Sequence, residues 1–321
     1  MLPRDLIISG KGVVDMVRIA KDTDLNFVKH LWSECFDDTA EFVDWNFSQN
    51  YTPQNTLIAD FGGIPASALQ LIPYDMKLFN SDISCRYVSG VSTLPNYRGK
   101  GLVRQLFDFA LPYMYRLGCG ISVLFPAVNG MYEKFGYRTV GERFEYTTSQ
   151  LSSGITEISE ELFKKLNFIY TREMSDKSFY TNRNRFDWKR ILTDLIPLSN
   201  GRVVFTELGY QLAYPNSGNE HKYIIEEVCG CGRDFLDAKP TYPIMVRVIN
   251  LHKFLRICAP YIPFNGVYTI KDEFIPQNNI SLRLASSNVY PCDEPGTEVD
   301  IGELCSEIFK YVPRLYVNLL F

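Results

Sequence analysis

The sequence lacks the features that mark membrane, secreted and nucleic-acid-binding proteins. No apolar run reaches the length of a transmembrane helix, and the apolar patch at residues 6–8 is too short for a signal peptide. The chain has no Lys/Arg run, and its formal net charge is −4. We therefore expect no membrane and no nucleic acid among its partners, and a cytoplasmic location.

Histidine and closely spaced cysteines are also scarce. The three histidines lie outside every motif described below, so none is a candidate catalytic base. Of the eight cysteines only Cys229 and Cys231 lie close together, with His221 as the one further ligand nearby. A structural zinc site needs four ligands. We therefore expect no bound metal, and reduced, mostly buried cysteines as in cytosolic proteins.

The chain does contain enough apolar residues for a large core. Of its 321 residues, 46% are hydrophobic and 14% are aromatic, which suggests two or three domains. Residues 1–15 are expected to form an arm, and residues 17–150 show the mixed helix and strand periodicity of an α/β unit. We expect strands at 17–20, 56–61, 66–72, 84–94 and 121–125, and helices near 27–35, 42–47 and 102–117.

The pattern is less regular after residue 150. Residues 237–240 look like a linker, and residues 243–255 predict a strand that runs into a helix. We further expect strands near 202–206, 210–214, 223–228, 266–271 and 280–285, and helices near 159–166 and 301–309.

The most informative stretch begins with a β-branched strand at residues 88–94. It ends in a turn that contains Arg98, Lys100 and two glycines, and the turn opens directly into an apolar-periodic helix. The first amides of a helix have no partner within it, and the helix dipole adds partial positive charge. Such a turn can bind a pyrophosphate, although an ordinary strand-to-helix turn would use the same glycines. Pro126, after the next strand, is expected to help separate the two central strands.

Two segments at this spacing, Tyr97-Arg98-Gly99-Lys100-Gly101-Leu102 and Tyr132–Tyr137, resemble the GNAT superfamily of acyl-CoA N-acyltransferases. The resemblance implies an α/β (α+β) fold, with a mixed sheet flanked by helices, and acetyl-CoA as co-substrate. The strand at residues 91–93 would pair with the pantetheine amides, and the turn would bind the pyrophosphate. The expected cofactor-binding residues are Val91, Ser92, Thr93, Arg98, Gly99, Lys100, Gly101 and Leu102.

The rest of the chain is similar to one branch of the superfamily, the enhanced-intracellular-survival (Eis) acetyltransferases. The similarity rests on the Tyr132–Tyr137 segment, on the strand that opens at Met245, and on the final Phe321. It implies a catalytic GNAT domain at 16–150, a reduced second GNAT-like domain at 151–240 and a small sterol-carrier-like α+β domain at 241–321. It also implies a homo-oligomer.

The same resemblance suggests the residues that move protons. It places the general acid at Tyr132, and phenol-to-thiolate transfer is not steeply unfavourable, because the two groups titrate near 10 and 8.5 in water. It places the base or amine-holding group at the α-carboxylate of Phe321. Alternatively, Tyr132 only packs in the core, and the terminus is frayed. The apolar run at 319–321 argues against fraying, because it favours burial.

The acceptor pocket is expected between the loop after the first helix and the end of the chain. Asp37, Asp38 and Glu41 are candidates to attract a cationic amine, or else form a solvated acidic loop. The predicted function is direct acetyl transfer from acetyl-CoA to a primary amine, of a small molecule or peptide, in a ternary complex. A CoA-binding regulatory or carrier protein with a degenerate acceptor site, and an acyltransferase for longer acyl groups, are the alternatives.

Overall fold

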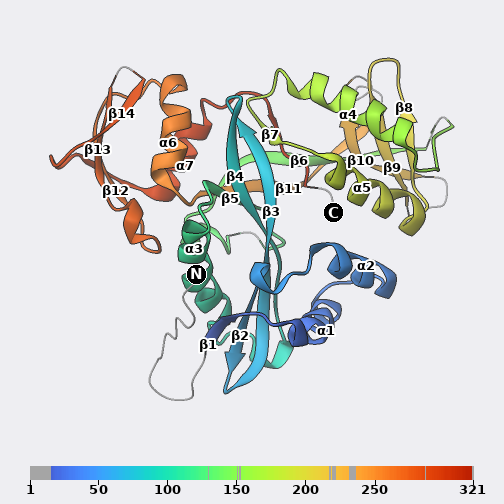
Figure 1. Ribbon diagram of the computed structural model, residues 1–321, viewed down its shortest axis with the longest axis horizontal. Helices are drawn as coiled ribbons and strands as arrows, with labels where there is room; N and C mark the ends of the chain where they lie inside the picture. The colour runs from blue at the N-terminus through green and yellow to red at the C-terminus, as the bar shows by residue number, and fades with distance from the viewer. Residues whose placement is uncertain are drawn as a thin grey trace.

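The computed structural model describes residues 16–128, 130–149, 151, 153–216, 218, 222–230, 236–285 and 287–319. The expected arm at residues 1–15 lies outside this range. The described chain forms three units around one large mixed sheet, with the middle and C-terminal units on opposite sides of the N-terminal unit (Figure 1). None of the described helices is long and apolar enough to cross a membrane.

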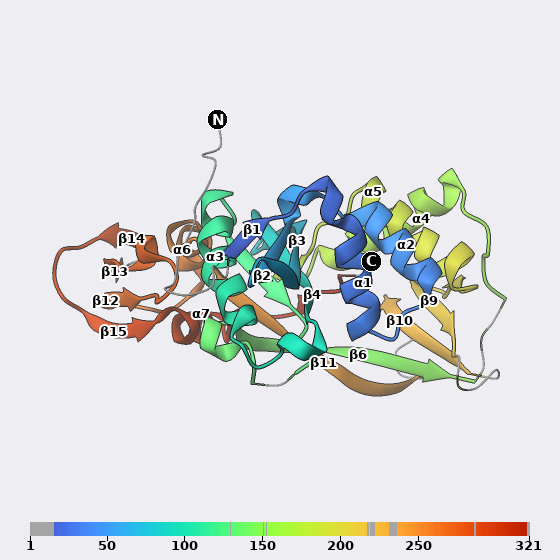
Figure 2. The same ribbon diagram turned by 90° about the horizontal axis from the view of Figure 1, so that it is seen from below.

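The N-terminal unit supplies one end of the sheet and the helices on both of its faces. Buried residues of α1 and α2 pack on one face with Ile58 and Ala68, and buried residues of α3 pack on the other with Leu69 and Leu71 (Figure 2). Its elements are β1 (Met16–Ile19), α1 (Leu25–Cys35), α2 (Ala40–Asn50), β2 (Thr56–Phe61), β3 (Ile64–Leu78), β4 (Ser81–Thr93), α3 (Leu102–Arg116), β5 (Ile121–Leu124) and β6 (Arg138–Thr148).

The middle unit extends the same sheet beyond β6. Its strands follow in the order β10, β9, β8, and α4 and α5 bury an aromatic core that includes Trp188 and Tyr210. The capping side chain of Asn184 accepts hydrogen bonds from two backbone amides at the start of α5. The elements are α4 (Glu160–Met174), β7 (Phe179–Thr181), α5 (Arg185–Thr193), β8 (Arg202–Phe205), β9 (Tyr210–Pro215) and β10 (Tyr223–Cys229).

The C-terminal unit has its own four-stranded sheet, in the order β14, β13, β12, β15. Helices α6 and α7 pack between this sheet and the large one, in a cluster that includes Phe254 and Phe309. The elements are α6 (Leu251–Cys258), β12 (Gly266–Lys271), β13 (Ser281–Ala285), β14 (Asn288–Pro291), β15 (Thr297–Asp300), α7 (Ile301–Phe309) and β16 (Leu315–Tyr316).

Strand β11 (Asp237–Val248) shows where the sequence-based organisation needs correcting. Residues 237–240 were expected to form a linker, but they are the first part of this strand and pair with β6. The later part of β11 lies between β5 and β6 and pairs with both. The sheet of the N-terminal unit is therefore completed by a strand that follows the middle unit in sequence, and β11 crosses the predicted boundary at residue 240. Hydrogen bonding of strand edges, which are distant in sequence, decides this placement.

Candidate functional site

The two central strands of the N-terminal unit separate. β4 and β5 pair in parallel only where Cys85–Tyr87 meet Ile121–Val123. Beyond this point β4 continues beside β3, while Leu124 of β5 pairs with Met245 of β11. The separation thus begins before Pro126, so that proline does not start it. The edge of β4 that contains Val91 and Thr93 faces the opening, as an added ligand strand requires.

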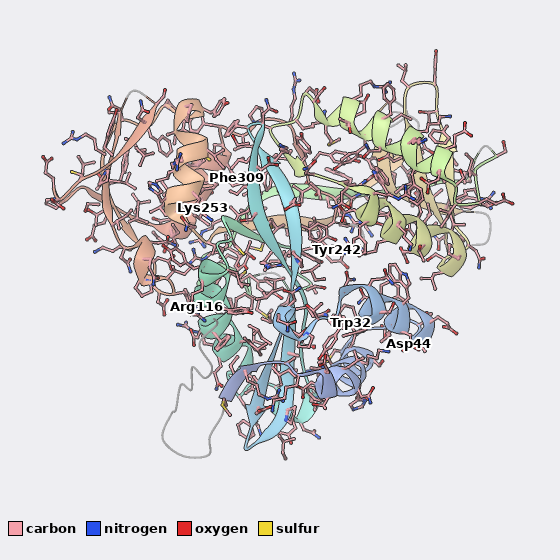
Figure 3. The ribbon with its side chains drawn as sticks, viewed as in Figure 1. Trp32, Asp44, Arg116, Tyr242, Lys253 and Phe309 are labelled. Atoms are coloured by element: carbon pink, nitrogen blue, oxygen red, sulfur yellow. The ribbon has the colours of Figure 1, made fainter. Side chains whose placement is uncertain are left out.

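A bulge in β4 accompanies this separation. The register of β3 and β4 shifts, so that Gln70 is opposite Ser89 while Ala68 is opposite Ser92. Gly90 adopts a left-handed backbone with φ +59°, and the indole of Trp32 packs against it, so a Cβ there would lie 2.6 Å from Trp32 Cζ3. Trp32 reaches the sheet from α1 (Figure 3) and donates a 2.8 Å hydrogen bond from Nε1 to Asp38. Only glycine satisfies both constraints at position 90.

Replacing Gly90 with alanine is expected to destabilise the protein through both constraints. The left-handed backbone costs a non-glycine residue about 1–2 kcal/mol, and overpacking against Trp32 adds about 1–3 kcal/mol. Gly63→Ala is the matched control, because Gly63 has φ +80° but no atom within 4 Å of an added Cβ. Denaturant unfolding should show a larger loss for Gly90→Ala, and equal losses would contradict a role for the Trp32 contact.

The turn after β4 has the geometry of an anion cradle. Gly99 and Gly101 have φ +74° and +81°, and Gly101 caps α3 without any side-chain hydrogen bond. The first amides of this 15-residue helix are therefore available to a ligand. Arg98 is exposed, and its Nε donates to Thr93 O at 3.2 Å. The Lys100 ammonium lies 4.3 Å from the centroid of the Phe61 ring, while the Leu102 side chain is buried below the turn.

Removing the Arg98 side chain is expected to weaken acetyl-CoA binding. A hydrogen bond to a charged group contributes about 1.5–3 kcal/mol, so Arg98→Ala should raise the Kd about tenfold or more. Arg116→Ala is the control, because Arg116 is an exposed arginine in the last turn of the same helix. If calorimetry gives the same Kd for Arg98→Ala and the wild type, the pyrophosphate is bound elsewhere.

Tyr132 lies just beyond the separated strands. It is 6% exposed, and its ring contacts Phe107 and Tyr137 with centroids 5.8 and 6.3 Å away. Burial raises the pKa of Tyr132 to about 12. Its hydroxyl has no hydrogen-bond partner among the described residues, whereas the Tyr137 hydroxyl lies 2.7 Å from Ser122 Oγ. Tyr132 is therefore the tyrosine of this cluster whose proton is available to a ligand.

A buried arginine that the sequence analysis did not single out supports the Tyr132 loop. Arg247 of β11 is fully buried, and its Nε donates to Phe135 O at 2.9 Å. Its Nη2 donates to Asp272 of the C-terminal unit at 2.6 Å, and Asp272 is fully buried too. Gly136, at φ +81°, packs against the guanidinium. The signal in the sequence was a single charge inside the apolar run at residues 244–249.

The three acidic candidates for acceptor binding, Asp37, Asp38 and Glu41, are all exposed. Asp38 accepts the Trp32 hydrogen bond, and its charge also acts on Asp194 of the middle unit. Burial raises the pKa of Asp194 to about 6, and the negative charges of Glu226 and Asp38 raise it further. Tyr214 opposes this shift, because its hydroxyl donates a 2.8 Å hydrogen bond to the Asp194 carboxylate. Among the described residues no hydrogen bond or ion pair joins Asp37 or Glu41 to Tyr132. The sequence reasoning missed Asp194, which no local motif marks.

One cysteine, also missed, lies beside β4. Cys35 is the last residue of α1, and its Sγ is 3.6 Å from Thr93 O and 3.8 Å from the Arg98 guanidinium. Cys231 and His221, the other members of the disfavoured zinc cluster, lie outside the described residues. Within the described ranges no group of three His, Cys, Asp or Glu side chains is arranged to hold a metal ion.

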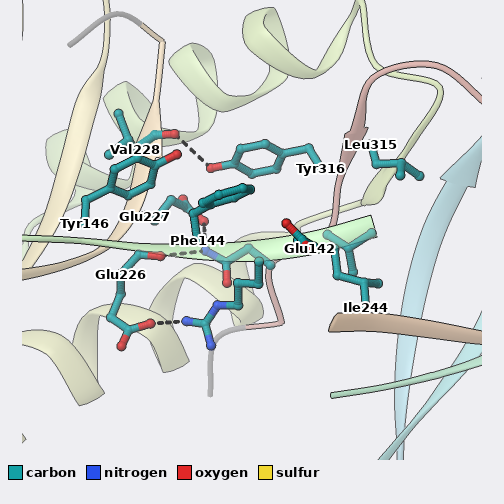
Figure 4. Close-up of a pocket in the computed structure, with 12 residues that line it drawn as sticks. Glu142, Phe144, Tyr146, Glu226, Glu227, Val228, Ile244, Leu315 and Tyr316 are labelled. Carbon is teal, nitrogen blue, oxygen red and sulfur yellow. Dashed lines mark hydrogen bonds and ion pairs between the residues drawn. The ribbon is translucent and has the colours of Figure 1, made fainter. Parts of the chain in front are cut away.

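Phe321 lies outside the described residues, and residues 317–319 before it are buried. Val317, Asn318 and Leu319 are 4%, 6% and 1% exposed. Leu319 belongs to the same buried cluster as Tyr87, the last β4 residue paired with β5. A cavity of about 190 Å³ lies beside this segment, between β6 and β10 (Figure 4). Arg143 and Glu226, which line the cavity, form an ion pair, and burial raises the pKa of Glu226 while Arg143 opposes the shift.

Known proteins share the fold of this chain, and a known domain family matches its N-terminal part. Residues 16–140 match the family model of the acetyltransferase (GNAT) domain. A probable N-acyltransferase of unknown function from Enterococcus faecalis superposes with a TM-score of 0.73 at 14% identity, over 92% of this chain and 90% of that one. Eis1 from Mycobacterium abscessus gives 0.68 at 14% identity over 94% and 90%. A GCN5-related N-acetyltransferase from Anabaena variabilis gives 0.69 at 14% identity over 91% and 89%.

These similarities establish the fold and the class of the N-terminal unit. No curated protein sequence matches the chain significantly. The mixed α/β architecture expected from the sequence is confirmed by the structures that superpose over most of the chain. Residues 16–140 form an acetyltransferase domain of the GNAT type, so the chain is an enzyme of the N-acetyltransferase class.

Proposed function

We propose that this protein transfers the acetyl group of acetyl-CoA directly to a primary amine within a ternary complex. The observation that carries the proposal is the convergence of three features. The separated β4–β5 pair opens beside the Gly99–Gly101 turn, and Tyr132 presents a hydroxyl without a partner among the described residues. Strand edge, anion cradle and proton donor are the parts that an acyl transfer from a CoA thioester needs.

In the proposed reaction the neutral amine attacks the thioester carbonyl. A C–N bond forms, the tetrahedral oxyanion collapses, and the C–S bond breaks. Tyr132 donates its proton to the leaving thiolate and regains one from solvent, while the amine proton passes to a base. We assign the base, directly or through water, to the Phe321 carboxylate. A carboxylate near pKa 3.5 is a weak base toward an ammonium near 10, so it also holds the amine by charge.

Because Cys35 lies beside β4, a covalent acyl-enzyme is the alternative mechanism that must be compared with direct transfer. In that alternative, acetyl would pass first to Cys35 Sγ. Cys35→Ser should retain turnover under our proposal, and initial rates should give intersecting double-reciprocal lines. Parallel lines, together with an acetylated Cys35 seen by mass spectrometry, would favour the covalent route.

The function itself is tested by thiol release from acetyl-CoA with a panel of primary amines, polyamines and peptides. We expect release that depends on one class of amine, and slower release from longer acyl-CoA substrates. If acetyl-CoA binds but no amine accelerates release, the protein is a CoA-binding regulatory or carrier protein. If longer acyl groups react faster, the acyl donor has been assigned wrongly.

The remaining assignments follow from the same resemblance. We infer a reduced second GNAT-like domain in the middle unit and a sterol-carrier-like domain in the C-terminal unit, in a cytoplasmic homo-oligomer. Five of the described cysteines, Cys85, Cys119, Cys229, Cys258 and Cys305, are free and buried, which suits a reducing compartment. Light scattering after gel filtration tests the oligomeric state, and a mass of one chain would refute it.

A further inference from the structure

The C-terminal segment, residues 315–319, is built into the middle unit. β16 pairs in parallel with β7, so that Leu315 lies opposite Phe179 and Tyr316 opposite Tyr180. Leu315 packs so closely on Gly141 of β6 that a Cβ there would lie 2.9 Å from its Cδ1. The segment is thus held by backbone pairing on one side and by close packing on the other.

The segment enters a second place where two strands of the large sheet separate. β6 and β10 pair where Tyr146–Thr148 meet Tyr223–Ile225, and then diverge. The C-terminal segment lies in this opening: the Tyr316 hydroxyl donates to Val228 O at 3.1 Å, and Asn318 Nδ2 donates to Glu226 O at 3.1 Å (Figure 4). Tyr316 and Asn318 therefore supply polar contacts to a strand edge that β6 leaves.

At the centre of these contacts is a buried group that we call the terminal clamp: Arg183, Glu227 and Asn318. Arg183 donates two hydrogen bonds to the Glu227 carboxylate, at 2.7 and 2.6 Å, and the two side chains are 1% and 0% exposed. Asn318 Nδ2 donates to Glu227 at 2.9 Å, and Arg183 donates to Asn318 O at 3.1 Å. Asn318 thus contacts both members of the ion pair, one through its side chain and the other through its backbone.

A buried ion pair of this kind is not by itself evidence of added stability. Well-packed apolar residues are often at least as stabilising in such a place, because desolvation offsets the attraction between the charges. The Arg183 guanidinium also lies 4.5 Å from the Tyr170 ring centroid and 4.9 Å from that of Trp188, so its position is restricted. The clamp can therefore hold a directional backbone contact at one defined place.

Among its described residues, the middle unit does not repeat the anion cradle of the N-terminal unit. After β4 the chain forms the glycine turn and then the 15-residue helix α3. After β10 only residues 230–236 remain before β11 begins, too few for a comparable turn and helix. Within the described residues no glycine turn leads from the second opening into a helix as it does before α3, and the C-terminal segment occupies this opening.

Neighbouring side chains connect the terminal clamp with the proposed active site. The Phe125 ring, directly after β5, has its centroid 5.7 Å from that of Tyr87 and 5.8 Å from the Arg143 guanidinium. Arg143 forms the ion pair with Glu226, whose backbone oxygen binds Asn318. A chain of direct contacts therefore leads from the clamp to the β4–β5 opening.

We propose that Arg183, Glu227 and Asn318 are positioning residues that hold the C-terminal segment at the acceptor side of the active site. The middle unit then serves as the anchor of that segment rather than as a second acetyl-CoA site. The proposal rests on the proposed acetyl transfer for its effect on turnover, but the anchoring itself does not depend on it.

The test uses the full-length protein with Asn318→Ala and Asn318→Asp. Asn318→Ala removes the two hydrogen bonds that Nδ2 donates, and Asn318→Asp also places a carboxylate against Glu227. Asn265→Ala and Asn265→Asp are matched controls at an exposed position of the C-terminal unit. Each protein is digested with a carboxypeptidase, and the products are measured by mass spectrometry. The wild type and the controls should keep Leu319, whereas both Asn318 variants should lose it.

Turnover is measured on the same proteins. We expect kcat/KM for the amine to fall about 10²-fold in the Asn318 variants, because small displacements of catalytic groups have effects of this size. The Kd for acetyl-CoA should stay at the wild-type value, with one site per chain, which a general loss of structure would not allow.

Each outcome is decisive. Digestion that stops at the same residue in the Asn318 variants and the wild type would overturn the clamp. Digestion that passes Leu319 with unchanged kcat/KM would overturn the positioning role. A wild type that binds acetyl-CoA but acetylates no amine would refute the proposed function instead, while the digestion result still decides whether the clamp holds the segment.

Discussion

Replacing Tyr132 with phenylalanine is expected to lower kcat by about 10²–10⁴ with little change in acetyl-CoA affinity. The variant keeps the ring contacts with Phe107 and Tyr137 and removes only the transferable proton. Single-turnover kinetics and calorimetry measure the two quantities separately.

Tyr137→Phe is the matched control for this experiment. It changes the same atom in the same aromatic cluster, but the Tyr137 hydroxyl is engaged with Ser122. We expect a loss of about 1 kcal/mol in stability from that hydrogen bond and a much smaller effect on kcat. Near-normal turnover of Tyr132→Phe would reduce Tyr132 to a packing residue.

The pKa of Tyr132 makes the same assignment testable by pH. Burial disfavours the phenolate and raises the pKa to about 12, so the proton remains on Tyr132 throughout the neutral range. The same apolar surroundings disfavour a thiolate, which keeps the transfer feasible although a thiol titrates near 8.5 in water. Wild-type kcat should therefore not decline with rising pH below about pH 10, and a decline near pH 8 would point to a different acid.

Extending the chain beyond Phe321 is expected to reduce kcat/KM about 10²-fold. An appended tag moves the negative charge away and leaves a neutral amide in its place. Deleting Phe321 instead shifts the carboxylate by up to about 3.5 Å, and misplacement on this scale has an effect of that order. Binding of acetyl-CoA, which we assign to residues around 91–102, should survive both changes.

A tag added to the N-terminal arm, ahead of Met16, is the control for the C-terminal extension. Steady-state kinetics of the two tagged proteins, compared with the untagged chain, decide the point. Equal kcat/KM for the N-terminally and C-terminally tagged forms would remove the Phe321 carboxylate from the mechanism, and the clamp would then be a structural anchor only.

The local elements around the Gly99–Gly101 turn could be predicted from the sequence because short-range rules govern them. Glycines at 99 and 101 supply the left-handed backbone of the turn, and the apolar spacing from Leu102 predicts α3 to within a residue of its observed end. The strand at 56–61 was predicted with its observed bounds for the same reason. Motif spacing was also sufficient to identify the acetyltransferase domain that the comparison with known families confirms.

The composition of the sheet and of the site was decided only in three dimensions. Strand pairing depends on edges that come together from distant parts of the chain, so residues 237–240 read as a linker although they begin β11. The separation of β4 from β5 begins before Pro126 and is accompanied by a register shift between β3 and β4, which no local pattern marks. No motif in the sequence marks Arg247, Asp194 or the Arg183–Glu227 pair. They gain a role only because burial forces each to find a specific partner, and that partner lies far away along the chain.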